Sequence, residues 1–175
     1  MTTRPPRILF YVQHLLGIGH LARASRIATA LKARGADITL VTGGLPVTGF
    51  PPSDVTHITL PAVQSADSGF KGLADAAGRP VDQSFLDARR DLLVDTFRQT
   101  APDVVVTEAF PFGRRQMRFE LLPLIEAIEA ARPRPVLCCS LRDILQENAK
   151  PGRDAETVAL VTAHFDRVLL HGDPA

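Results

Sequence analysis

Apolar residues along this chain follow two alternating spacings. Short aliphatic and β-branched runs of strand length occur at 7–13, 38–42, 55–60, 104–107, 136–140 and 168–170. Between them, apolar residues recur every three or four positions, which predicts helices over 20–34, 82–99, 116–131 and 154–165. Continuously hydrophobic strands are typical of a parallel sheet with helices on both faces. The pattern therefore predicts an α/β, Rossmann-like fold of this kind.

Some segments depart from this alternation of strands and helices. The stretch 43–52 holds three prolines and three glycines, and 63–80 is rich in small and polar residues without periodicity. Long loops of this type are either binding lids or disordered insertions. The stripe Leu121, Leu122, Ile125 and Ile128 is expected to face the core. The run 168–170 has the composition of a buried strand.

Length and charge exclude several classes of function. At 175 residues and 45% hydrophobic content, residues 1–175 are expected to form a single domain. The net charge is +1, from 20 basic and 19 acidic side chains. No global field would therefore attract nucleic acid, and a charged ligand must be bound locally.

The two cysteines indicate a reducing compartment. Cys138 and Cys139 are adjacent, so they cannot form an ordinary disulfide and lack the spacing of a zinc site. No apolar run is long enough for an export signal or a membrane span. We expect a cytoplasmic protein without a metal or another cofactor. Peripheral membrane contact stays possible but is not indicated.

The segment from 17 to 23 carries the strongest chemical signal. It reads Gly-Ile-Gly-His-Leu-Ala-Arg and joins the first strand to the first helix, where ligands bind in parallel sheets. The glycines allow a tight turn and close backbone approach, and the helix N-terminus favours an anion or a sugar oxygen. His20 there could accept a proton from a hydroxyl. Alternatively, this is a plain turn and His20 only caps the helix.

Two carboxylates follow neighbouring strands and are candidate partners of His20. Glu108 follows the run 104–107 and Asp143 follows 136–140, so either could hold the imidazole in one tautomer. The alternative for Glu108 is a helix-capping or solvated carboxylate. Arg142, beside Asp143, either binds substrate or pairs with one of these carboxylates.

Other polar residues near these loops have less specific interpretations. Arg114 and Arg115 suit phosphate binding, although such a pair more often marks a solvated helix start. His14 is expected to be a structural polar group. The segment 17–23 is not a dinucleotide fingerprint, because Leu21 or Ala22 stands where a third glycine is required.

Residues 8–44 resemble the opening of the GT-B glycosyltransferases, particularly the group that contains the lipid-II-forming N-acetylglucosaminyltransferase. The Gly-x-Gly-His-x-x-Arg pattern is also similar to the UDP-sugar hydrolase of pseudaminic acid biosynthesis. The segments 107–113 and 140–143 look like parts of a group of predicted bacterial glycosyltransferases. The chain departs from the lipid-linked group at Leu21, where that group has a proline, and in a first loop with fewer glycines.

The resemblance implies the N-terminal half of a GT-B fold, with the C-terminal donor-binding domain absent from this chain. Such a half holds a hydroxyl acceptor, while the other half binds a nucleotide-sugar donor. By resemblance His20 would be the general base of an inverting sugar transfer or a binder of the transferred sugar. From their places after the strands, Glu108, which could orient the imidazole or bind sugar hydroxyls, and Asp143 are the other residues expected to be catalytic. The expected substrate-binding residues are Gly17, Gly19, Arg23, Arg114 and Arg142.

Two other functions stay open. One is a nucleotide-sugar hydrolase of the same fold, in which His20 activates water. The other is a non-catalytic binding subunit of a split glycosyltransferase. Because a second domain would grip the donor, we expect this domain to be inactive in isolation. Either the sequence is cut at a domain boundary or the protein works with a separately encoded half.

Overall fold

The computed structural model describes residues 4–15, 17–66, 72–142 and 152–172. In chain order the elements are β1 (Arg7–Val12), α1 (Gly19–Ala33), β2 (Asp37–Thr42), β3 (Thr56–Thr59), β4 (Val63–Ser65), β5 (Leu73–Asp75), α2 (Gln83–Thr100), β6 (Val104–Glu108), the 3-10 helix η1 (Arg115–Met117), α3 (Arg118–Ala130), β7 (Val136–Arg142), α4 (Arg153–His164) and β8 (Arg167–His171).

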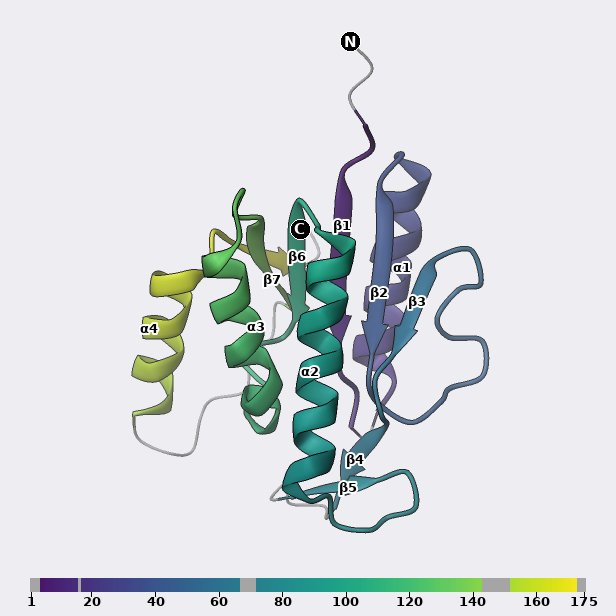
Figure 1. Cartoon of the computed structure of the whole chain (residues 1–175). Helices are drawn as coiled ribbons and strands as arrows, with labels where there is room; N and C mark the ends of the chain where they lie inside the picture. The colour runs from purple at the N-terminus through teal and green to yellow at the C-terminus, as the bar shows by residue number, and fades with distance from the viewer. Residues whose placement is uncertain (1–3, 16, 67–71, 143–151, 173–175) are drawn as a thin grey trace.

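The main sheet has six strands in the order β3-β2-β1-β6-β7-β8, and every neighbouring pair is parallel (Figure 1). Each strand run predicted from the sequence contributes one of these strands. The predicted Rossmann-like parallel sheet is therefore confirmed. The order reverses at β1, so the loops after β1 and β6 open at the point where such sheets bind ligands.

Helices cover both faces of the sheet, as predicted. Successive side chains of a strand point to opposite faces. Phe10 of β1 therefore packs in one cluster with Leu21 and Ala24 of α1. Tyr11 packs in the other, with residues of α2 and α3, including the predicted stripe residues Leu121, Ile125 and Ile128. Figure 1 shows α2 and α3 in front of the sheet and α1 behind it.

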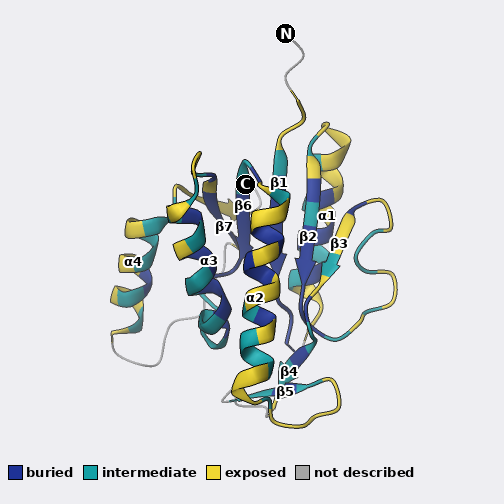
Figure 2. Cartoon of the chain, in the orientation of Figure 1, coloured by how far each residue is buried: buried dark blue, intermediate teal, exposed yellow. Residues whose placement is uncertain are grey.

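Two expectations are corrected at the periphery. Residues 63–80 are not entirely irregular, because β4 and β5 form an antiparallel pair whose Val63 and Leu73 join the core. β8 is not a buried strand: Leu170 is 63% exposed, and the strand is mostly yellow or teal where it is visible in Figure 2. The apolar composition of 168–170 predicted a strand correctly but does not determine whether a further layer covers it.

A buried ion pair joins α2 to α3. The Arg89 side chain is fully buried, and its Nε donates to Oε2 of the equally buried Glu120 at 2.6 Å. The hydroxyl of Tyr11 donates to the other Glu120 oxygen. Arg89 also donates to Gln13 Oε1 at 2.6 Å and to the Gly43 carbonyl at 2.9 Å. Burial and the neighbouring Glu120 charge raise the pKa of Tyr11 well above its usual value, so the phenol stays protonated.

Gly43 and Gly44 are packing positions. A Cβ atom at Gly43 would overlap the guanidinium of Arg89, and one at Gly44 would lie 2.5 Å from the His14 carbonyl oxygen. Both are tighter than real Cβ contacts. The first two residues of the loop 43–52 are therefore fixed by the core.

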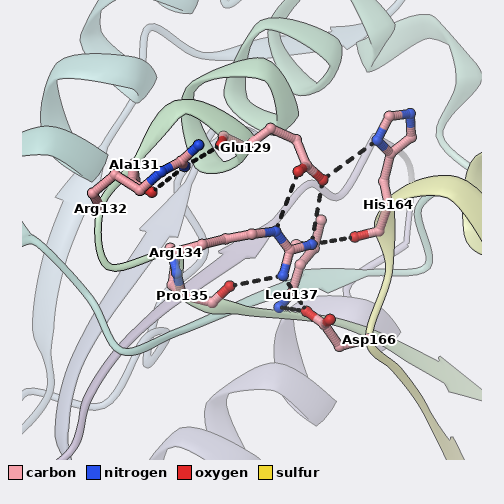
Figure 3. A network of polar contacts seen from close by, with 8 residues as sticks. All are labelled: Glu129, Ala131, Arg132, Arg134, Pro135, Leu137, His164 and Asp166. Atoms are coloured by element: carbon pink, nitrogen blue, oxygen red, sulfur yellow. Dashed lines mark hydrogen bonds and ion pairs between the residues drawn. The ribbon is translucent and has the colours of Figure 1, made fainter.

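A second arginine, Arg134, lies at the end of the sheet where β7 and β8 begin (Figure 3). Arg134 donates to Asp166 Oδ2 at 2.8 Å and to the His164 carbonyl at 2.8 Å, and it also pairs with Glu129 of α3. Asp166 in turn accepts the amide N–H of Leu137 at 2.7 Å. The starts of β7 and β8 and the end of α3 are thus held by one charged cluster. In the described part of the chain, no helix is long and apolar enough to span a membrane.

We expect Glu120→Gln to lower the free energy of unfolding by about 3 kcal/mol or more, because it leaves the Arg89 charge buried without its counter-charge. Urea denaturation followed by circular dichroism measures the loss. The control is Glu126→Gln, on the exposed side of the same helix. A loss below about 1 kcal/mol, as for an exposed ion pair, would show that the Arg89–Glu120 pair is not a structural requirement.

Candidate functional site

The loop between β1 and α1 brings an open helix N-terminus to the carboxyl edge of the sheet. Gly17, Ile18 and Gly19 are exposed, and His20 is partly exposed. Ile18 precedes the helix without a side-chain cap, and the first turn of α1 contains no acidic residue. The amide N–H groups of this turn therefore carry the partial positive charge of the helix end toward solvent.

His20 and Glu108 meet across the β1–β6 pair. Glu108 is the last residue of β6, and its side chain is fully buried. Its Oε1 lies 2.9 Å from Nδ1 of His20, whose side chain is 26% exposed. The structure thus brings together two of the three residues expected to be catalytic. The third, Asp143, lies outside the described residues.

The contacts of Glu108 determine the tautomer that we assign to His20. Arg23, one turn further along α1, donates to the same Oε1 and lies 3.3 Å from His20 Nδ1. A guanidinium can only donate, so an Arg23–His20 bond would need an unprotonated Nδ1, which could not bond to the carboxylate. Because the charged acceptor is the stronger partner, Nδ1 carries a proton, and in the neutral ring Nε2 then keeps its lone pair.

Glu108 is ionised at neutral pH. Burial acts to raise the pKa of this carboxyl, but hydrogen bonds from His20, Arg23 and Ser140 outweigh it and hold the pKa below its ordinary value. A buried carboxylate with this many donors is stabilised as the charged form. The site therefore presents a fixed negative charge behind the imidazole of His20.

Sequence reasoning did not assign a site role to Ser140 or His171. Ser140 lies in β7 opposite Glu108, and its hydroxyl donates to Glu108 Oε2 at 2.6 Å. His171, in β8, places Nε2 at 3.0 Å from Ser140 Oγ. The resemblance of the segment 140–143 was a signal for Ser140, but the face of the sheet on which Ser140 lies cannot be read from an apolar strand pattern.

Arg114 is not the solvated helix start that its sequence position favoured. Its backbone is left-handed, with φ of 59°, and its Nε donates to the Gln13 carbonyl at 2.8 Å. Burial lowers the pKa of the guanidinium. Ala109, in the same loop, also has a positive φ of 66°. Two non-glycine residues in this costly conformation show that the β6–α3 loop is held in a specific shape beside the site.

The remaining candidates lie around this centre. Arg142 is the exposed last residue of β7. Arg115 pairs with Glu156 of α4. His14 is buried and bonds to the Leu45 carbonyl at 2.8 Å, in agreement with a structural role. Burial lowers the pKa of His14.

The cysteines are buried free thiols in β7. Burial raises the pKa of Cys139 to about 12, so this thiol is protonated and unreactive at neutral pH. Among the residues that the structure describes, no group of three or more His, Cys, Asp or Glu side chains could hold a metal ion.

The glycines of the first loop are not required by the backbone. Neither Gly17 nor Gly19 has a positive φ, and a Cβ atom at either would meet nothing within 4 Å. Neither residue therefore adopts a conformation that only glycine can reach, although the turn itself can still be tight. Close approach of a ligand to the backbone, the other reason given for these glycines, stays a prediction.

Comparison with solved structures shows which known fold this chain shares. Over 98% of its length the chain superposes on 47% of Acinetobacter baumannii MurG, with a TM-score of 0.55 and 10% identity. Over 96% of its length it matches 43% of a glycosyltransferase from Rickettsia africae, with a TM-score of 0.54 and 12% identity. The chain has the fold of the N-terminal half of a GT-B glycosyltransferase.

The GT-B likeness concerns the fold alone, and the chain spans about half the length of these proteins or less. A candidate epimerase from Burkholderia cenocepacia is also similar, with a TM-score of 0.51 and 16% identity over 95% of this chain and 54% of that one. No family model matches the sequence, and no curated protein does.

We expect Gly17→Ala and Gly19→Ala to change the free energy of unfolding by less than about 0.5 kcal/mol, because the added methyl group is accommodated without contact. Gly44→Ala, which forces a Cβ against His14, is the contrasting variant and should destabilise by about 1–3 kcal/mol. Urea midpoints of the three variants measure this difference. A strongly destabilised Gly17→Ala variant would return the loop glycines to a backbone role.

Proposed function

We propose that this chain is the acceptor-side half of a glycosyltransferase that moves a sugar from a nucleotide-sugar to a hydroxyl group, with inversion at the sugar carbon. The contact that carries the proposal is the 2.9 Å approach of His20 Nδ1 to Glu108 at the carboxyl edge of β1 and β6. The GT-B fold supports it. A donor-binding domain would complete the site.

In this reaction His20 acts as the general base. Its Nε2 lone pair takes the proton of the acceptor hydroxyl as the hydroxyl oxygen forms a bond to the anomeric carbon of the sugar. The bond from that carbon to the nucleotide diphosphate breaks, and the diphosphate leaves with the electron pair. Glu108 stabilises the imidazolium as it forms and keeps the ring in the reactive tautomer.

Positive groups at the same edge suit the departing diphosphate. The uncapped N-terminus of α1 provides amide donors, and the open space at Gly17 and Gly19 admits a ligand to the backbone. Arg114, on the loop after β6, donates its Nε to the Gln13 carbonyl, and its charge interacts with Glu108. We infer that Arg23 holds Glu108 in place and does not bind substrate directly, because its guanidinium pairs with Glu108.

We predict that His20→Ala lowers turnover by about 100-fold or more while donor affinity changes little, because a general base contributes about this factor. The assay uses the protein that joins this domain to its donor-binding half. It follows release of nucleoside diphosphate from UDP-glucose, UDP-N-acetylglucosamine, TDP-glucose and GDP-mannose, with and without a panel of hydroxyl acceptors. Glu108→Gln should also lower turnover.

His57→Leu serves as the control, since this histidine lies on β3 at the far edge of the sheet. Equal turnover in His20→Ala and the unaltered protein would remove His20 from the mechanism. Release that does not depend on an acceptor would identify a nucleotide-sugar hydrolase instead. Binding of a nucleotide-sugar without turnover in any combination would indicate the non-catalytic subunit.

A further inference from the structure

The hydrogen bonds around Glu108 continue to two side chains that the proposed reaction does not use. Ser140 is 1% exposed and faces Glu108 across the β6–β7 pair. His171 lies in the next strand, β8, with its Nε2 3.0 Å from the Ser140 hydroxyl oxygen. A continuous path therefore runs from β8 through β7 and β6 to the imidazole of His20 on α1.

The direction of each bond in this path is determined by the chemistry of the groups. The Glu108 carboxylate can only accept, so the single hydroxyl proton of Ser140 is donated to Oε2 at 2.6 Å. Ser140 Oγ can then only accept from His171, which must carry a proton on Nε2. All donors in the path thus point toward Glu108.

The two oxygens of Glu108 have different partners. Oε1 accepts from His20 and Arg23, while Oε2 accepts from Ser140. Because the carboxylate is fully buried, loss of the Ser140 donor would leave Oε2 without this partner, at a substantial cost. The group would then lose the restraint that keeps Oε1 turned toward His20. Among the described residues, the titratable and charged groups that interact with Glu108 are His20, Arg23, Arg114 and Cys139.

We propose that Ser140 and His171 are positioning residues: His171 fixes the rotation of the Ser140 hydroxyl, and Ser140 holds the Glu108 carboxylate in the orientation that fixes the tautomer of His20. The consequence for catalysis rests on the proposed function of His20. The geometric effect on His20 does not, and it can be measured in the chain alone.

The other outer strand of the sheet, β3, offers a matched control. There Thr42 Oγ1 lies 2.7 Å from Nε2 of His57, so a hydroxyl on one strand again pairs with a histidine on the adjacent edge strand. This pair lies outside the site. Removing His57 therefore reproduces the loss of an edge-strand histidine without touching Glu108.

The test is NMR of the 175-residue chain with 15N-labelled histidine at neutral pH. In the unaltered chain we expect His20 to be protonated at Nδ1, with a slowly exchanging N–H signal. Ser140→Ala and His171→Leu should each speed exchange of this proton with water by about tenfold, the equivalent of one hydrogen bond to a charged group, and should populate the other tautomer. His171→Gln, which keeps a donor for Ser140, should restore the signal, and His57→Leu should leave it unchanged.

An unchanged His20 signal in His171→Leu would overturn the proposal. His171 lies on an exposed edge strand, so its substitution should leave the fold intact. The His171→Leu variant therefore tests the proposal even if Ser140→Ala destabilises the chain. In the assembled enzyme, His171→Leu should lower kcat and leave KM within about twofold. A response of the His20 signal together with full activity of His20→Ala would refute the proposed function and leave the positioning intact. An inactive His20→Ala variant with no response to His171→Leu would refute the positioning alone.

Discussion

The carboxyl edge of this sheet depends on one buried charge pair, Arg89 with Glu120. A buried guanidinium must satisfy its donors, and Arg89 does so by bonding to the end of β1, the loop after β2 and the segment that leads to β4. The end of β1 leads directly into the loop that carries His20. Gln13 links the two regions, because its side-chain oxygen accepts from Arg89 while its carbonyl accepts from Arg114.

Glu108 is a second buried charge that is stabilised by hydrogen bonds from several elements. A carboxylate in the interior is costly unless donors surround it, and here donors arrive from α1 and β7. The proton on His20 Nδ1 is one of them, so the stabilisation of Glu108 and the orientation of His20 are the same interaction. In the neutral imidazole, this coupling leaves Nε2 of His20 as the acceptor.

Periodicity predicted the six strands, the four main helices and the loop that carries His20, because these features follow from local spacing. The pairing of Glu108 with His20 was also accessible, since both follow central strands of a parallel sheet. Arg89 and Glu120 were missed, because a helix pattern assigns charged residues to solvent. The exposure of β8 and the contacts of His171 depend on which neighbours a strand has in three dimensions, and no local pattern contains that information. Asp143 stays a prediction.

The exposed strand β8 has a practical consequence for handling the chain. Among the described residues β7 is its sole partner, so the backbone N–H and C=O groups of its other edge are available to a further strand, next to apolar side chains such as Leu170. Open edges of this type template self-association. The isolated domain is therefore expected to self-associate at high concentration, and a charged residue in place of Leu170 is expected to reduce this association.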